Sequence, residues 1–283
     1  MEDNSQRDLF APILSNDALM GPFLLIARLF TTGIFVFYIY FEIVKIIHAP
    51  SALLYLAVVA QFVGIVLVAL GYRTRFAAIL LAVCLITILL VIHWSLGLGI
   101  SFVAVATKTT AVTAGFFFMF AYGPGPLSLD RYRGASKPLI LDNTAVMGPL
   151  LLAGRIMATF VFFYMDMRKI FHTAFVQNYM SIHHVPPNLI YLAILTQTVF
   201  PLLVLLGYKT RYGALALAGF CLIASSLFHT AFSNPYELQH FFLDWAIAGG
   251  LLFMFAQGPG PLSLDALMNR ASAREPRLAV EKA

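Results

Sequence analysis

The chain ends each of its two halves with nearly the same 13 residues. FMFAYGPGPLSLD covers residues 118–130 and FMFAQGPGPLSLD covers residues 253–265, so that only Tyr122 and Gln257 differ. A repeat at this spacing indicates a tandem duplication, and it constrains the fold before any single motif does. We therefore expect each half to fold as one copy of the same unit, and we look for function where the halves differ.

The composition is too apolar for a soluble domain. Hydrophobic residues make up 60% of the 283 residues and charged residues 11%, whereas soluble domains average about 45–50% and about 25%. This predicts an integral membrane protein with the lipid bilayer as its first partner. The net charge of +5 is not gathered into a basic stripe, which excludes a nucleic-acid-binding protein. No short apolar core with a cleavage site precedes residue 20, so we expect no cleaved signal peptide.

Each half contains four apolar segments long enough to cross a bilayer, which takes about 20 helical residues. The predicted fold class is therefore an all-α integral membrane protein, with eight transmembrane helices arranged as two tandem four-helix bundles. The predicted spans are 21–47, 53–71, 76–96, 102–122, 148–172, 188–207, 212–231 and 237–257. The predicted domains are a polar segment 1–19, a first repeat 20–130, a linker 131–146, a second repeat 147–265 and a polar tail 266–283.

Two short basic turns predict the orientation in the membrane. Gly71–Arg75 and Gly207–Arg211 each follow the second span of a half, where a glycine ends the helix and the cations suit the headgroup region. Twelve Lys and Arg residues fall on the side of these turns, and three fall on the opposite side. The positive-inside rule then places both termini in the cytoplasm.

Ionisable residues inside the spans are functional hypotheses by default, because they are costly in lipid. Arg28 and Arg155 lie about two turns into the first span of each half, where we expect them to hold helices together or to meet lipid phosphates. His93 and His229 occupy matching positions near the outer leaflet, at the same offset of 136 that relates the two basic turns. Further ionisable groups end the first span of each half: Glu42, Lys45 and His48, then Asp166, Lys169 and His172. Helix-capping or headgroup contact is the expected role of His48, His172, His183 and His184, the last two in the predicted loop before Pro186.

The last span of the second half carries an additional polar face. Glu237, His240 and Asp244 are spaced i, i+3 and i+7, which places them on one side of a helix. A histidine paired with a carboxylate can hydrogen-bond a quinone head group and exchange protons with it. The sequence therefore predicts an outer-leaflet quinone pocket whose candidate residues are His93, His229, Glu237, His240 and Asp244.

Lys108 is the charged residue that the first half offers in the corresponding span. At an offset of 136 it is the counterpart of Asp244, and opposite charges at related positions can pair between the halves inside the bilayer. We therefore group Lys108 with Arg28 and Arg155 as structural intramembrane charges. The halves would then meet at this level of the membrane.

The sequence specifies no metal site and no catalytic residue. Neither HExxH nor CxxC occurs, and the two cysteines, Cys84 and Cys221, lie in apolar segments where thiols are usually inert. A haem held by His93 and His229 stays open as an alternative. Catalytic residues are left unassigned.

Each half resembles the DoxX family of small four-helix membrane proteins. The resemblance rests on a glycine followed by Thr-Arg after the second span, on the GPGPLSLD ending, and on paired residues: Arg28 and Arg155, Lys45 and Lys169, His93 and His229. It implies an inner-membrane protein linked to redox metabolism, since relatives include a membrane subunit of thiosulfate:quinone oxidoreductase. Two departures are Gln61 and Gln197, where the family often has a glutamate.

The leading interpretation is a quinone-interacting membrane subunit of an oxidoreductase system. The chain has no recognisable flavin, nicotinamide or iron–sulfur motif, so a redox partner protein is expected to supply electrons, and catalysis by this chain alone stays open. The alternatives are a transporter, for which duplicated bundles are a common plan, and a non-catalytic membrane scaffold for a partner protein.

Overall fold

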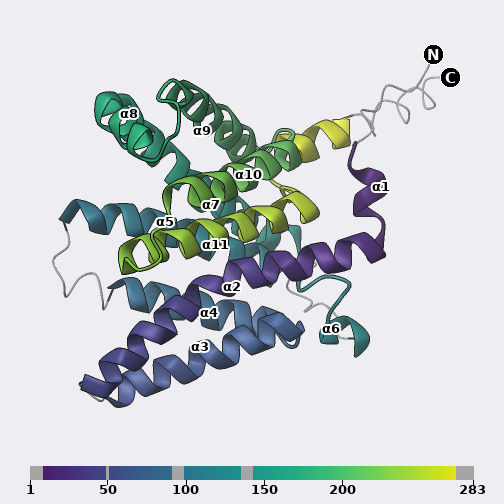
Figure 1. Ribbon diagram of the computed structural model, residues 1–283. Helices are drawn as coiled ribbons and strands as arrows, with labels where there is room; N and C mark the ends of the chain where they lie inside the picture. Colours follow the sequence, from purple (N-terminus) through teal and green to yellow (C-terminus); the bar gives the residue numbers. More distant parts are fainter. Residues whose placement is uncertain (1–8, 49–50, 91–98, 135–142, 272–283) are drawn as a thin grey trace.

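The structure is a computed structural model that describes residues 9–48, 51–90, 99–134 and 143–271. Every regular element in these residues is helical (Figure 1), which confirms the all-α prediction for this part of the chain. In the first half the helices are α1 (Ala11–Leu14), α2 (Asp17–His48), α3 (Ala52–Leu70), α4 (Thr74–Ile88), α5 (Gly99–Tyr122) and α6 (Leu129–Tyr132). The second half contains α7 (Thr144–Phe171), α8 (Thr173–Ile182), α9 (Leu189–Leu206), α10 (Thr210–Phe228) and α11 (Pro235–Gln257).

Seven of the described helices are long and apolar enough to cross a membrane: α2, α3, α5, α7, α9, α10 and α11. The third predicted span, 76–96, begins as α4, an apolar helix of 15 residues, and its second part falls outside the described residues. Seven of the eight predicted spans are therefore present as helices of membrane-crossing length among the described residues, and the count of eight stays a prediction. The cytoplasmic location of the termini and the domain boundaries stay predictions.

The first helix of each half packs mainly on the last helix of the other half. α2 lies along α11, α7 lies along α5, and α5 crosses α11 at the centre (Figure 1). At this crossing a Cβ atom added to Gly250 would stand 2.8 Å from the Cα atom of Gly115, and such small residues let helix backbones approach closely. The two bundles predicted from the sequence are thus joined through one shared core.

The repeated LSLD sequence holds the basic turn of its own half. The Asp130 carboxylate accepts hydrogen bonds from the backbone N–H groups of Arg73 (2.7 Å) and Thr74 (3.0 Å) at the start of α4. Asp265 bonds Lys209 N (2.8 Å) and the following N–H at the start of α10 in the same way. Arg73 and Lys209 both have left-handed backbones, with φ of 45° and 46°. Each carboxylate therefore caps a helix and stabilises a backbone conformation that non-glycine residues rarely adopt.

Arg28 and Arg155 hold the same frame together from inside. Both side chains are fully buried. The Arg28 guanidinium donates to Val68 O (3.1 Å) at the end of α3 and to Leu127 O (2.5 Å) in the repeat. Arg155 donates to the end of α9 and to Leu262 O. Of the two roles expected for these arginines, the structure places them between helices and away from lipid phosphates.

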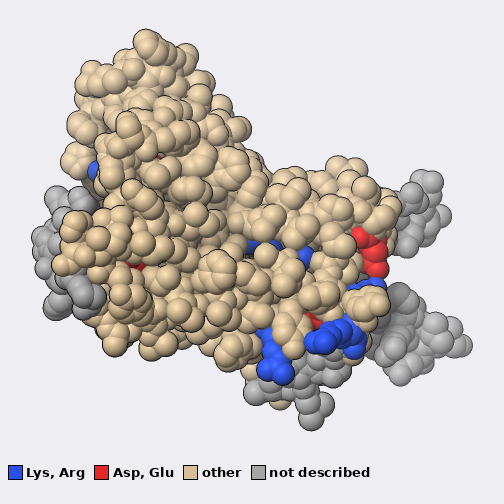
Figure 2. Space-filling model, turned by 60° about the horizontal axis from the view of Figure 1, so that its bottom comes forward, with Lys and Arg blue, Asp and Glu red and all other residues tan. Residues whose placement is uncertain are grey.

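Surface charges gather at one end of the molecule. Figure 2 shows the blue and red side chains mostly at the end where α1 and α6 lie in Figure 1, whereas the rest of this face carries almost none. The exposed pair Arg131 and Asp17 belongs to this end, with Arg131 Nη2 2.9 Å from Asp17 Oδ2. An apolar body with one charged end is the surface expected of a protein that spans a bilayer.

The segment between residues 172 and 187, predicted as a loop, contains α8. Its apolar residues Val176 and Met180 stand four positions apart and pack with Val185 and Ile190, while Phe175 is exposed. This spacing forms an amphipathic helix, which ends before His184, a residue with a φ of 58°. The prediction of a loop was wrong because the segment is too short and too polar to count as a span.

Candidate ligand-binding site

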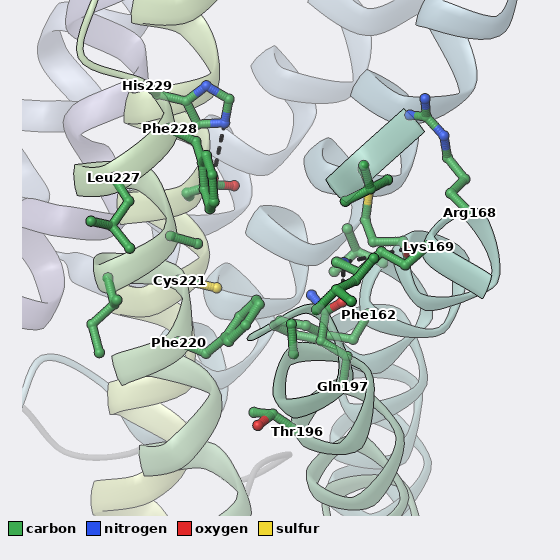
Figure 3. A pocket seen from close by; sticks show the side chains of 18 of the residues that line it. Phe162, Arg168, Lys169, Thr196, Gln197, Phe220, Cys221, Leu227, Phe228 and His229 are labelled. Carbon is green, nitrogen blue, oxygen red and sulfur yellow. Dashed lines mark hydrogen bonds and ion pairs between the residues drawn. The ribbon is translucent and has the colours of Figure 1, made fainter. Parts of the chain in front are cut away.

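The second half contains a cavity of about 880 Å³. Figure 3 shows Phe162, Lys169 and Gln197 on one wall and Cys221 and His229 on the other. The first wall comes from α7 and α9 and the second from α10 and its C-terminal end, while α5, α8 and α11 complete the lining. Four of the five residues predicted for a ligand pocket line this cavity: His229, Glu237, His240 and Asp244. The fifth, His93, lies outside the described residues.

The cavity opens between α9 and α10. Leu192 of α9 and Ile223 and Leu227 of α10 line it, and they are also 59%, 63% and 45% exposed. Side chains that face both the cavity and the outside mark its opening. In a helix that crosses a membrane, exposed leucine and isoleucine contact lipid tails, so the opening faces the bilayer.

The polar end of the cavity is a row of ionisable groups in which basic and acidic side chains alternate. His229 Nδ1 lies 2.6 Å from Glu237 Oε2, and His229 Nε2 lies 3.7 Å from Asp244 Oδ2. Asp244 Oδ1 lies 2.7 Å from Lys108 Nζ. Lys108 belongs to α5, so the ion pair between the halves that the register suggested is present.

The local sequence explains why His229 and Glu237 meet. α10 ends at His229, whose N–H donates to Ser225 O (2.9 Å), and α11 begins after Asn234. The Asn234 side chain accepts from Tyr236 N (3.0 Å) and caps α11. Glu237 then falls in the first turn of α11, where a carboxylate is favoured by the helix dipole. The short connection therefore brings the end of one helix over the start of the next.

His240 lies beside this row but belongs to no hydrogen bond of the described residues. Its side chain is buried, and neither Nδ1 nor Nε2 has a partner in the described part of the chain. The ring stacks on His229, with centroids 5.3 Å apart and planes at 20°, and it makes a T-shaped contact with Tyr236, with centroids 4.4 Å apart and planes at 66°. The cluster can thus exchange a proton between His229 and Glu237, and it can offer His240 as a free donor and acceptor.

Lys169 and Gln197 form a second polar group on the opposite wall, which the sequence analysis did not assign to the site. Lys169 Nζ donates to Gln197 Oε1, and in the first half Gln61 Nε2 donates to Glu42 Oε2 (2.7 Å). Lys169 is therefore the counterpart of Glu42, and pairing it with Lys45 was wrong. The signal was available, since 169 − 42 equals the offset of 127 between the two buried arginines.

α8 joins the cavity at its polar end, again without a signal in the sequence analysis. Tyr179 lines the cavity, and its hydroxyl donates to Phe228 O (3.3 Å) at the end of α10. Burial and then the neighbouring Glu237 carboxylate raise the pKa of Tyr179, so its hydroxyl stays protonated and able to donate.

The cysteines and possible metal ligands add little to this arrangement. Cys221 is buried and lines the cavity as a free thiol, while Cys84 is half-buried and also free. Among the described residues, no group of three or more His, Cys, Asp or Glu side chains is placed to hold a metal ion. The polar chemistry of the site therefore comes from its histidines, carboxylates and lysines.

Comparison with known proteins identifies the family. The sequence model of the DoxX family matches residues 150–230. Inner membrane protein YqjF of Escherichia coli (strain K12) is 35% identical over 120 residues, which cover 42% of this chain and 92% of that protein. No solved structure matches the chain. The match to nearly the whole relative, together with the family match and the apolar helices, shows that the chain is a multi-pass membrane protein of the DoxX family.

Proposed function

We propose that this protein resides in the inner membrane and binds a quinone in the cavity, as the membrane subunit of a redox system. One observation carries the proposal: a single cavity joins an apolar opening between α9 and α10 to a partly buried cluster of histidines and carboxylates. A quinone has the matching structure, because its long apolar tail keeps it in the bilayer and its ring carries oxygens that hydrogen-bond. The name of the bacterial relative supports the inner-membrane location.

The walls of the cavity suit a flat ring. Phe162, Phe200, Phe220 and Phe228 line it, and aromatic rings pack in stacked or edge-on arrangements at favourable energy. The volume of about 880 Å³ falls within the range of about 300–1,000 Å³ that is usual for small-molecule sites. A mostly apolar cavity with a few polar groups at one end is also usual for such sites.

The row of ionisable groups at the polar end of the cavity suits the proton chemistry of a quinone. Reduction of a quinone to a quinol takes up two electrons and two protons, and oxidation releases them. His229 lies within hydrogen-bond distance of Glu237, and a histidine near a carboxylate is the usual group for proton exchange near neutral pH. The electrons are proposed to come from a partner protein, in agreement with the resemblance to the membrane subunit of thiosulfate:quinone oxidoreductase.

The test is the amount of quinone bound per chain in nanodiscs with a known mole fraction of ubiquinone. We compare the wild type, the double variant His229→Ala/Glu237→Ala, and His48→Ala as a control, since His48 is exposed at the end of α2 and does not line the cavity. We expect about one quinone per chain in the wild type and the control, and loss in the double variant. No quinone above the lipid background in the wild type would reject the proposal and leave the transporter and scaffold alternatives.

A further inference from the structure

We infer that His240 is the residue that hydrogen-bonds a ring oxygen of the quinone head group. The inference rests on the proposed function, because it assigns one contact within the proposed site. The two stacked histidines, His229 and His240, would then have different roles, although the sequence analysis assigned both the same role. The chemical feature that the cavity selects is then an oxygen atom on an apolar ring.

His240 has unused hydrogen-bonding capacity. The side chain is 4% exposed and lines the cavity, and neither ring nitrogen has a partner among the described residues. Buried polar side chains in native proteins are nearly always hydrogen-bonded. A ligand in the cavity is the natural partner, since the ring already borders that space.

The ionisable groups next to His240 are already paired with one another. His229 has Glu237 at one ring nitrogen and Asp244 near the other. The Lys108 ammonium pairs with Asp244 at 2.7 Å. A ligand at Nδ1 of His229 would have to displace Glu237, and one at Nε2 would compete with the Asp244 carboxylate 3.7 Å away, whereas a ligand that bonds His240 displaces no side chain.

The His240 ring is held in one plane by two aromatic neighbours. It stacks on His229 and makes a T-shaped contact with Tyr236. A neutral imidazole offers one N–H donor and one bare nitrogen acceptor. The N–H can donate to the carbonyl oxygen of a quinone, and the bare nitrogen can accept from the hydroxyl of a quinol. One fixed side chain can therefore hold both forms of the ligand, while an oxygen-free ring leaves it unpaired.

The experiment compares two ligands that differ in their ring oxygens. The chain contains two tryptophans, and Trp245 lies near the site, because its Nε1 donates to Ser225 Oγ (3.0 Å), one turn before His229. In a Trp94→Phe background, quenching of Trp245 by a decyl-substituted 1,4-benzoquinone gives its Kd. Competition against that quinone gives the Kd of decylbenzene. Both are measured in nanodiscs for the wild type, His240→Phe, His240→Gln and the control His48→Phe.

We expect His240→Phe to weaken benzoquinone binding about 3- to 10-fold, the usual net effect of one hydrogen bond, and to leave the Kd of decylbenzene unchanged. Because glutamine keeps a donor and an acceptor, His240→Gln should recover part of the preference for the quinone. His48→Phe should match the wild type with both ligands.

The outcomes separate this inference from the proposed function. No quinone binding by the wild type would overturn both. Quinone binding by the wild type that is unchanged in His240→Phe would overturn the assignment of His240 and leave the proposed site standing. Equal weakening of the quinone and decylbenzene in both His240 variants would also overturn it, because that result means that the ring only shapes the cavity.

Discussion

Replacing Lys108 by alanine should destabilise the protein through Asp244. Lys108 Nζ lies 2.7 Å from Asp244 Oδ1, and the two side chains are 9% and 13% exposed. Removing one partner of a buried ion pair costs about 3–5 kcal/mol, because it leaves an uncompensated charge. His229 stays 3.7 Å from the other carboxylate oxygen, so we expect a loss of about 3 kcal/mol, the lower end of that range. At about 2–4 °C per kcal/mol, the Tm should fall by about 6–12 °C.

The assay follows unfolding in detergent with a maleimide dye that reacts with Cys84 and Cys221, both free thiols, as they become exposed. The double variant Lys108→Ala/Asp244→Ala should recover at least half of the lost Tm, since no unpaired charge remains between them. Arg131→Ala is the matched control, because it breaks an exposed pair worth only about 0–1 kcal/mol. If the double variant instead loses the sum of the two single losses, the pair does not join the halves as argued.

Two further substitutions test the frame with the same unfolding assay. Gly250→Ala should lower the free energy of unfolding by about 1–3 kcal/mol through overpacking, because the new Cβ would meet the Gly115 backbone at 2.8 Å. The control Gly219→Ala, with no atom within 4 Å of its added Cβ, should raise it by up to about 1 kcal/mol through helix propensity. Equal effects of the two substitutions would refute a close crossing of α5 and α11. Asp265→Ala should lower the free energy of unfolding by about 0.5–2 kcal/mol through the loss of a helix cap, since the Asp265 carboxylate accepts hydrogen bonds from Lys209 N and the next N–H. An unchanged Tm would show that the turn is stable without this carboxylate.

The two halves share one frame but differ where the cavity lies. In each half a buried arginine and a capping aspartate tie the same turn to the same loop. At the equivalent position of the first helix, however, the first half has Glu42 bonded to Gln61 and the second half has Lys169 bonded to Gln197. The second half also adds α8. The repeat therefore preserves the contacts that hold helices together and varies those that face the cavity.

Much of the candidate site could be read from spacing along one helix or from the offset between repeats. The i, i+3, i+7 spacing brings Glu237, His240 and Asp244 to one face, and all three line the cavity. The offset of 136 matched Lys108 with Asp244, which are in contact. Lys169 was missed, because the wrong lysine of the first half was aligned with it. Such an error follows naturally when the repeats differ in length between their first two spans, because the offset changes there from 127 to 136.

The sequence by itself determined the long apolar helices, the repeated turns and the membrane setting, but not the amphipathic α8. These are local properties: a run of apolar residues in lipid must satisfy every backbone N–H and C=O within its own segment, and the helix does so. Only the tertiary structure decided which helices meet. α2 lies on α11 and α5 crosses α11, and at both contacts glycines far apart in the chain from their partners let the backbones approach: Gly249 against Ala27 O, and Gly250 against Gly115. The cavity and its opening follow from that packing, since its lining comes from six helices that no local pattern brings together.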